Sequence, residues 1–240
     1  MTRAIILAAG RGSRMKEMTA EKPKCLTMLY GRPLLEHQLS ALRAAGITDI
    51  AVVTGYMREA LTSYALVEFY NSRWAETNMV ASLCCAREWL MNEECIVSYS
   101  DIFYSPEAVI TLLNTNDDVA ITYDPNWLNL WRQRFSDPLS DAESFKLDEE
   151  SYLIEIGNKT TDAALIQGQY MGLLKFSPVG WRRVEEYREL LPVVMQDNMH
   201  MTGTLNSMIQ QNDIKIKAFP YDGEWGEIDS PEDLACYEQS

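Results

Sequence analysis

Residues Leu7–Lys24 read Leu-Ala-Ala-Gly-Arg-Gly-Ser-Arg-Met-Lys-Glu-Met-Thr-Ala-Glu-Lys-Pro-Lys, and the apolar run Ala4–Leu7 that leads into them is typical of a buried strand. The two glycines allow positive φ angles and a close approach of the backbone to a ligand. Successive free N–H groups in such a turn form a concavity that binds anions. This segment, the glycine loop, concentrates five cations in a chain whose net charge is −14, and Arg11, Arg14, Lys22 and Lys24 are among them. We therefore predict that it binds phosphate groups.

Three known loops share such a pair of glycines. A dinucleotide-binding fingerprint would carry a third glycine near Met15, and a P-loop would carry Gly-Lys-Ser/Thr after four spacers; neither is present. Leu7–Arg14, Thr19 and Pro23-Lys24 instead resemble, position by position, the signature loop of the sugar-phosphate nucleotidyltransferases. One departure is Glu17, which stands where many members carry a proline. The alternative is a tight strand-to-helix turn with solvated charges.

The composition of the chain limits the class of protein. Its 240 residues, 47% of them hydrophobic, predict one globular domain (1–240) whose core needs neither disulfides nor metals. The excess of 35 Asp and Glu over 21 Lys and Arg argues against general binding to nucleic acid or to an anionic membrane. No stretch approaches the ~20 apolar residues of a membrane span. The 5 cysteines show no metal-ligand spacing, which indicates reduced thiols in a cytoplasmic protein.

Strand and helix patterns alternate along the chain, which indicates a parallel sheet with crossover helices. Short apolar or alternating runs predict strands over residues 50–54, 66–70, 95–100, 119–123, 167–176 and 214–218. Helical periodicity is found over residues 33–42, 79–91, 181–191 and 202–211. Residues 146–147 and 152–157 are predicted to pair as strands. With the resemblance, this pattern implies a Rossmann-like three-layer α/β fold that has a mostly parallel mixed sheet and a small insertion at about 124–145.

Two acids far apart in the sequence are candidates for a metal site. Asp101 stands at the carboxyl end of the strand predicted over 95–100, where open α/β sheets bind ligands. Asp229 lies in the run Trp225–Asp233, which is similar to the Glu-Ile-Asp-Ser/Thr-Pro-Glu-Asp segment that carries the family's second metal carboxylate. The resemblance implies that both acids bind Mg²⁺. The alternative for each is a helix cap, before Pro106 and at the start of a last helix.

The resemblance also assigns residues to the nucleotide. Arg14 would neutralise the leaving pyrophosphate and Lys24 the α-phosphate. Asn78 is a candidate cap for the helix that begins at Met79, and with Ser82 it is also expected to hydrogen-bond a pyrimidine base. The full set of expected nucleotide contacts is Leu7, Ala8, Ala9, Gly10, Arg11, Gly12, Ser13, Thr54, Gly55, Tyr56, Asn78 and Ser82.

The insertion at about 124–145, which we call the arm, interrupts the alternation. Trp127 and Trp131 are four residues apart and would share one face of a helix. Aromatic faces suit an ammonium group, and Arg132 or Arg134 suits a phosphate or phosphonate. The alternative is a hydrophobic arm that packs on the core or on a second subunit, and a homodimer is compatible with that.

The arm also narrows the resemblance. The run 127–143 is similar to the branch of the family that cytidylylates small phosphorylated amino compounds, such as phosphocholine, and their phosphonate and amino-acid-phosphate relatives. This branch carries a Glu and a Lys near the acceptor, which Glu155 and Lys159 match; solvated charges in a hairpin are the alternative. We expect His200 to pack rather than to touch the acceptor. The expected acceptor contacts are Trp127, Trp131, Arg132, Arg134, Glu155, Lys159 and Tyr170.

The predicted activity follows from this resemblance. The protein would be an Mg²⁺-dependent cytidylyltransferase that joins CTP to a small phosphorylated or phosphonate amino compound and releases pyrophosphate. Both reactants are anions, so such an enzyme needs charge neutralisation and in-line positioning more than an acid or a base. Two alternatives stay open: a sugar-1-phosphate nucleotidyltransferase and a non-catalytic, nucleotide-binding regulatory subunit.

Overall fold

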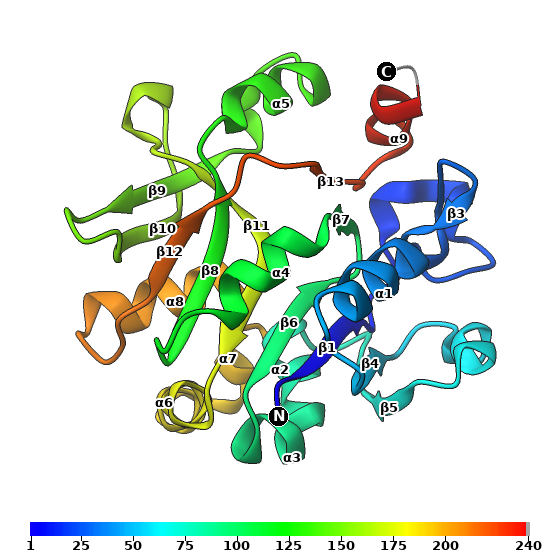
Figure 1. The fold of residues 1–240 in the computed structure, drawn as a ribbon, viewed down its shortest axis with the longest axis horizontal. Helices are drawn as coiled ribbons and strands as arrows, with labels where there is room; N and C mark the ends of the chain where they lie inside the picture. The colour runs from blue at the N-terminus through cyan, green and yellow to red at the C-terminus, as the bar shows by residue number, and fades with distance from the viewer. Residues whose placement is uncertain (239–240) are drawn as a thin grey trace.

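A computed structural model describes residues 1–238 of the chain. Its centre is a seven-stranded sheet with the strand order β12-β8-β11-β6-β1-β4-β5 (Figure 1). These strands are β1 (Arg3–Ala8), β4 (Ile50–Thr54), β5 (Val67–Tyr70), β6 (Cys95–Tyr99), β8 (Val119–Asp124), β11 (Gln169–Phe176) and β12 (Lys217–Pro220).

The sheet is mixed but mostly parallel. Strand β1 pairs in parallel with β4 and β6, β4 pairs in parallel with β5, and β12 pairs in parallel with β8. Only β11 runs antiparallel, between β6 and β8. All five residues of β4 are buried, because helices cover both faces of the sheet. The predicted fold class is therefore confirmed.

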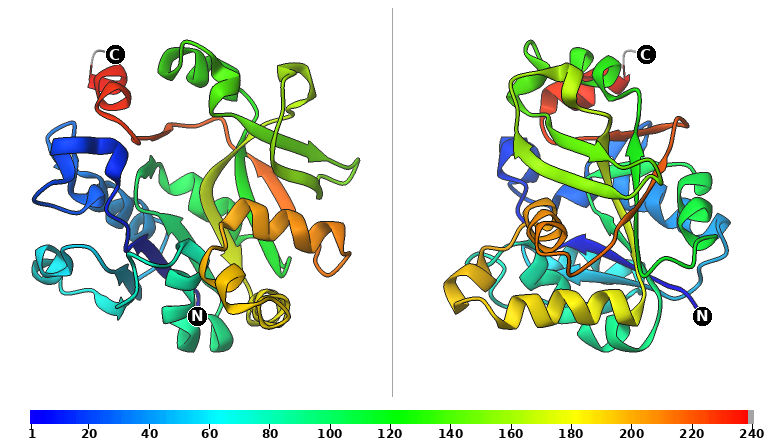
Figure 2. Two further views of the ribbon diagram at one scale, coloured as in Figure 1. Left: turned by 180° about the vertical axis from the view of Figure 1, so that it is seen from behind. Right: turned by 90° about the vertical axis from the view of Figure 1, so that its left-hand side faces the viewer.

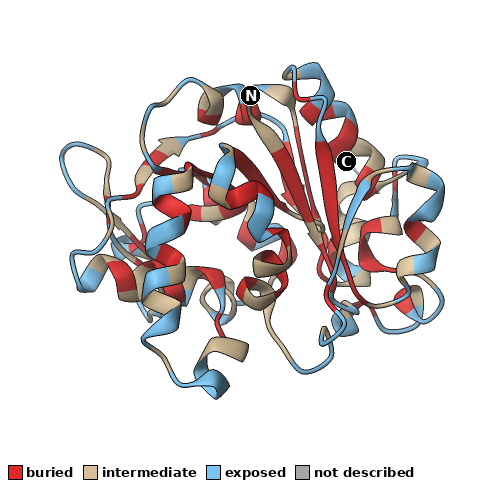
Figure 3. Ribbon diagram, turned by 90° about the horizontal axis from the view of Figure 1, so that it is seen from below, coloured by how far each residue is buried: buried red, intermediate tan, exposed pale blue. Residues whose placement is uncertain are grey.

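The helices form the two outer layers. In Figure 1, α1 (Leu34–Ala44) and α4 (Pro106–Leu113) lie in front of the sheet. The view from behind in Figure 2 shows the helices of the opposite face: α2 (Met79–Leu83), α3 (Arg87–Asn92), α6 (Pro178–Glu189), α7 (Val193–Asp197) and α8 (Met201–Gln210). Buried residues gather on the central strands and on the inward sides of these helices (Figure 3).

Two predicted elements differ in detail. The helix expected over 79–91 is divided into α2 and α3 by a 3-10 turn, Cys84–Ala86. The strand expected over 214–218 begins only at Lys217, because the carbonyl of Ile216 accepts a hydrogen bond from the N–H of Leu153 at 2.9 Å and so belongs to the neighbouring hairpin. No helix within residues 1–238 is long and apolar enough to cross a membrane.

Three short strand pairs flank the main sheet. They are β2 (Met28–Leu29) with β3 (Arg32–Pro33), β7 (Ile102–Tyr104) with β13 (Trp225–Glu227), and β9 (Glu143–Leu147) with β10 (Leu153–Lys159). The third pair confirms the predicted hairpin.

The arm leaves the main sheet after β8. It contains α5 (Trp127–Arg134) and a 3-10 turn, Pro138–Ser140, and it ends in β9. Helix α5 packs beside the last helix, α9 (Pro231–Glu238), at the top of Figure 1. The indoles of Trp127 and Trp131 belong to the main hydrophobic core.

Candidate active site

The glycine loop borders a cleft of about 330 Å³ at the carboxyl ends of β1 and β6. We call it the first cleft. Of the predicted nucleotide and catalytic residues, the first cleft is lined by Leu7, Ala9, Gly10, Gly12, Ser13, Arg14, Lys24, Asn78, Ser82, Asp101 and Asp229. Segments more than 200 residues apart therefore meet at one end of the sheet, where Lys24 donates a hydrogen bond to Asp229.

Gly12 gives the loop its shape. Its φ of +66° lies in the left-handed region, whereas Gly10 does not have a positive φ, so only one of the two glycines turns as predicted. The carbonyl of Gly12 accepts hydrogen bonds from the N–H of Met15 at 3.0 Å and from the hydroxyl of Thr19 at 3.1 Å. A Cβ on Gly12 would lie 2.8 Å from Cδ of Lys24. Glycine is thus required here for both the backbone angle and the space beside Lys24.

Lys24 joins the loop to the two predicted acids. Its buried Nζ donates to Oδ2 of Asp101 at 2.6 Å and to Oδ1 of Asp229. Nη1 of Arg14 lies 2.7 Å from Oδ2 of Asp229. Burial lowers the pKa of Lys24, but Asp101, Asp229 and Glu227 together outweigh it, so the pKa is raised and the amine stays charged.

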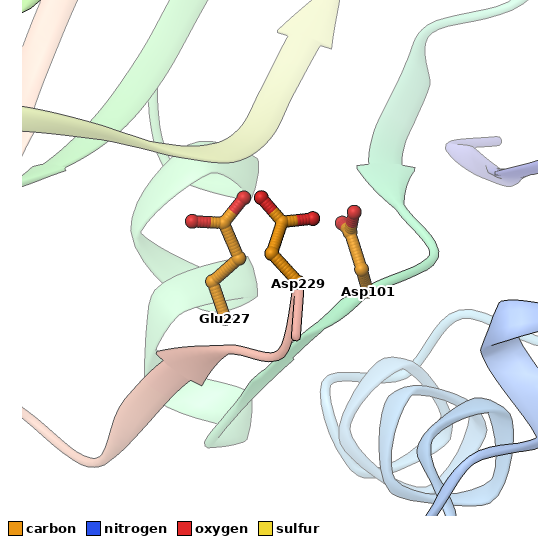
Figure 4. A group of neighbouring side chains, drawn as sticks. All are labelled: Asp101, Glu227 and Asp229. Carbon is orange, nitrogen blue, oxygen red and sulfur yellow. The ribbon is translucent and has the colours of Figure 1, made fainter. Parts of the chain in front are cut away.

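A third carboxylate, Glu227, completes what we call the acidic cluster with Asp101 and Asp229. One oxygen from each of the three lies within 4.8 Å of the others, and Figure 4 shows the three carboxylates directed to the same side. The N–H of Ile228 donates to the carbonyl of Asp101 at 2.9 Å and fixes the two segments together. Burial raises the pKa of Glu227 to about 7; the negative charge of Asp229 adds to this and Arg134 opposes it.

Sequence analysis did not assign Glu227 to the site. The available signal was its position two residues before Asp229, since alternate residues of an extended segment point to the same side. The Glu-Ile-Asp run shows this spacing, but the spacing predicts a shared side only if the segment is extended, and the sequence alone does not establish that.

The acidic cluster fits a hard divalent cation. Oδ1 of Asp101 is buried and has no hydrogen-bond partner among residues 1–238. An unpartnered buried carboxylate oxygen beside two further carboxylates is the kind of donor set that Mg²⁺ takes. These residues are therefore a possible metal site.

The start of α2 forms the side of the first cleft where the nucleotide base is expected. Oδ1 of Asn78 accepts the N–H of Met79 at 2.8 Å, which confirms the predicted cap. The hydroxyl of Ser82 accepts from Nδ2 of Asn71 at 2.9 Å. Trp74 and Thr77 also line the cleft, and sequence analysis did not select them, because their segment carries no motif.

Five predicted nucleotide contacts lie outside the first cleft. The hydroxyl of Thr54 bonds Glu68 at 2.5 Å, and the hydroxyl of Tyr56 donates to the carbonyls of Thr19 and Ala20 at 3.0 and 2.9 Å. The set that does not line the cleft is Ala8, Arg11, Thr54, Gly55 and Tyr56. Tyr56 therefore holds the glycine loop through its backbone carbonyls, and it does not line the first cleft as expected.

A second cavity of about 220 Å³ adjoins the first cleft, and the two share Arg14, Met79, Tyr99 and Asp229. Its walls are acidic and aromatic. The carboxylates are Asp141, Glu143, Glu227 and Asp229, and the aromatic side chains include Tyr99, Trp131, Phe145, Tyr170 and Trp225. Burial raises the pKa of Glu143, although a hydrogen bond from Thr202 and the charge of Lys159 oppose the shift.

Of the predicted acceptor contacts, Trp131 and Tyr170 line the second cavity. The other five do not: Trp127, Arg132, Arg134, Glu155 and Lys159. The indole N–H of Trp127 is buried and donates to the carbonyl of Ile166 at 3.3 Å. Arg132 is exposed, and Glu155 is paired with Lys146 at 2.6 Å.

Arg134 requires the largest correction. Its side chain is 0% exposed and its guanidinium is held by Asp233 and Glu227, so it is not accessible to a phosphate group in the second cavity. Residues 127, 131 and 134 share the inward face of α5, and only Trp131 reaches the second cavity. Lys159 donates to the carbonyl of Ser140 at 3.5 Å. His200, for which packing was expected ahead of an acceptor contact, lines the second cavity.

The fold and these contacts define a mixed α/β protein whose glycine loop faces two acidic segments. Residues 4–151 match the family described as the MobA-like NTP transferase domain. The chain belongs to this family.

Relatives extend this similarity over the whole chain. A CTP:phosphoglutamine cytidylyltransferase of Campylobacter jejuni is 38% identical and matches 96% of this chain and 97% of its own length. A 2-aminoethylphosphonate cytidylyltransferase of Lancefieldella rimae is 26% identical over 99% of this chain and 92% of its own. The solved structure of a CTP:phosphocholine cytidylyltransferase from Streptococcus pneumoniae superposes with a TM-score of 0.72 at 19% identity, covering 99% of this chain and 98% of that one, and shares its fold.

Proposed function

We propose that this protein is an Mg²⁺-dependent cytidylyltransferase that joins CTP to a small phosphorylated or phosphonate amino compound and releases pyrophosphate. The observation that carries the proposal is the convergence of Lys24 and Arg14 on Asp101 and Asp229, where the first cleft meets the second cavity. The relatives named above act on CTP and on three such acceptors, which supports the same class here.

The residues would divide the work by charge. The glycine loop would hold the triphosphate through its backbone, with Arg14 next to the leaving pyrophosphate and Lys24 next to the α-phosphate. The acceptor's phosphate oxygen would attack the α-phosphorus while the bond to pyrophosphate breaks. The acidic cluster would hold Mg²⁺, which supplies charge neutralisation for the phosphates when bound. No proton has to be removed from an acceptor phosphate that is already ionised near neutral pH.

The second cavity supports an acceptor that carries an amino group. Its carboxylates and aromatic faces attract a cation. Glu143 and Trp131 are the residues that we propose contact the ammonium, with Tyr170 beside them. Ser144, Gln169 and Thr202 also line this cavity and are able to hydrogen-bond a sugar ring, so the sugar-1-phosphate activity remains the second candidate.

An acceptor panel tests this proposal. Pyrophosphate release would be measured with each of the four nucleoside triphosphates against phosphocholine, phosphoethanolamine, 2-aminoethylphosphonate, phosphoglutamine and a sugar 1-phosphate. An alkyl phosphate of matched length without an amino group serves as control. We expect turnover with CTP and an amino acceptor and little with the alkyl phosphate. Turnover only with the sugar phosphate would favour the second candidate, and no turnover with CTP bound would favour a regulatory subunit.

The contribution of the ammonium contact can be isolated. Glu143→Gln removes the negative charge while keeping the size of the side chain. We expect it to raise KM for the amino acceptor and to leave KM for CTP close to its original value. Equal changes in both constants would contradict the placement of the amino group beside Glu143.

A further inference from the structure

One buried cation connects the arm to the acidic cluster. Arg134 is the last residue of α5, and its side chain is completely buried. Its Nη1 donates to Oε2 of Glu227 at 2.9 Å, and its Nε donates to Oδ1 of Asp233 at 2.8 Å. The rings of Trp131 and Phe135 lie 5.2 and 5.0 Å from the guanidinium carbon. The guanidinium is therefore fixed in position by two acids and two aromatic rings.

Asp233 links Arg134 to Asp229, because its carboxylate bonds both the guanidinium and the backbone of Asp229. Oδ2 of Asp233 accepts the backbone N–H groups of Asp229 and Ser230, each at 2.9 Å. The N–H of Asp233 donates in return to the hydroxyl of Ser230 at 3.1 Å, which closes a capping box at the start of α9. The backbone that carries Asp229 is thus held by a carboxylate that Arg134 itself holds.

We propose that Arg134 is a positioning residue that sets the affinity of the acidic cluster for its divalent cation. This inference rests on the proposed metal site. Through Glu227 directly and through Asp233 to Asp229, a single side chain of the arm determines where two of the three carboxylates lie. The arm would then support the metal site in addition to lining part of the second cavity, which it does with Trp131, Asp141, Glu143, Ser144 and Phe145.

The chemistry of arginine explains why an arginine, rather than a lysine, stands at position 134. A guanidinium is planar and always charged, and it presents several donors in a fixed arrangement, so it can bind two acids at once. A lysine ammonium is a compact charge on a flexible stem and would hold one of the acids well. Without any cation, the buried carboxylate of Asp233 would lose its charge partner and Glu227 would lose the hydrogen bond that holds it. Glu227 would then be free to turn away from the cluster.

The experiment measures metal binding directly, with Mn²⁺ as the probe and no nucleotide present. Free Mn²⁺ would be followed by electron paramagnetic resonance on the full chain. The variants are Arg134→Met, which removes the charge, and Arg134→Lys, which retains it and is more certain to fold. Lys175→Met is the control, because Lys175 is also a buried cation paired with an acid, Glu94, but lies at the end of the sheet away from Asp101.

We expect Arg134→Met to raise the Kd for Mn²⁺ by about 10-fold or more, the range found when partners of metal ligands are removed. Arg134→Lys should raise the Kd for Mn²⁺ by a smaller factor. Lys175→Met should lower Tm and leave the Kd for Mn²⁺ unchanged. High Mg²⁺ concentration should restore turnover in the Arg134 variants. An unchanged Kd in either folded Arg134 variant would overturn the inference and leave Arg134 as a support for the arm alone.

The proposed metal site has its own control. Asp229→Asn should abolish Mn²⁺ binding in the otherwise unchanged chain. If the affinity does not depend on Asp229, then the metal site is wrong and the role of Arg134 is overturned with it. If the affinity depends on Asp229 but not on Arg134, then only the inference fails.

Discussion

The glycine loop and the arm are both marked clearly in the sequence, yet their side chains are used differently. In the glycine loop, Gly12 and Lys24 face the first cleft, so the motif and the site coincide. In the arm, Trp127 and Arg134 face the interior, and Trp131 alone of its predicted contacts reaches the second cavity. The turn of the loop is held by backbone contacts of Gly12, so Arg14 and Lys24 are able to line the cleft. A helix that must cover a core uses its largest side chains for packing.

Among these variants, removing the charge of Lys24 in the glycine loop should have the largest effect on turnover. Lys24→Met is expected to lower kcat by at least ~10²-fold, because a preorganised positive charge beside the reacting phosphate is lost. Lys16→Gln is the matched control, since Lys16 lies in the same loop with its side chain 71% exposed. Steady-state pyrophosphate release measures both. Near-normal turnover of Lys24→Met would break the contrast between the loop and the arm.

The geometry of the loop can be tested without removing a charge. Gly12→Ala is expected to lower the free energy of unfolding by about 1–2 kcal/mol, because an alanine there must adopt a left-handed conformation. Since its Cβ would lie 2.8 Å from Lys24, kcat should also fall, on the order of 10-fold. Gly10→Ala is the control for stability, because a Cβ there meets nothing within 4 Å. Chemical denaturation and turnover, measured on the same preparations, would separate the two effects.

The two tryptophans of the arm should separate binding from stability. Trp131→Ala is expected to raise KM for the amino acceptor by about 3- to 10-fold, the size of a lost cation–π contact, with a smaller change in KM for CTP. Trp127→Phe should leave both constants unchanged and lower the free energy of unfolding by about 0.5–3 kcal/mol. If Trp131→Ala changes neither KM, then helix α5 of the arm is purely structural. If Trp127→Phe changes the acceptor KM, the division between the two residues is wrong.

The smallest expected effect is a change of stability with pH, and it comes from Glu227 in β13. The pKa of Glu227 is raised by burial from 4.5 to about 7, so the folded chain keeps a proton that the unfolded chain has released. This group's contribution to stability is therefore complete below about pH 4.5 and is lost as the pH rises to about 7. With metal removed by EDTA, denaturation at several pH values should show this decline. Glu227→Gln should remove that part of the slope; an identical pH profile would show that Glu227 is not buried as a protonated acid.

The sequence was informative wherever a residue type has one dominant use. The alternation of strands and helices predicted the sheet and its outer layers, and the cap at Asn78 was found because few side chains can close a helix start. Glu227 was not found, because its alignment with Asp229 depends on the pairing of β13 with β7, which is a contact between distant segments.

The arm shows the opposite difficulty. Its aromatic and basic residues have two common uses, packing and binding, and a sequence pattern does not separate them. Arg134 is an example, since the acids that bind it, Glu227 and Asp233, are about a hundred residues away. Tyr56 is another, because its hydroxyl bonds the carbonyls of the glycine loop and so faces away from the cleft. Such assignments need the tertiary structure.

The four residues common to the first cleft and the second cavity have a further consequence for how this family diversifies. Asp229 and Arg14 belong to both, whereas Glu143 and Trp131 belong to the second cavity alone. On the proposed assignment, mutations in the part of the second cavity that the first cleft does not share would alter the choice of acceptor and leave Arg14 and Asp229 in place. An ancestral enzyme of this shape would be able to acquire new substrates by changing a few residues in the arm and in β9. Its nucleotide chemistry would be inherited intact.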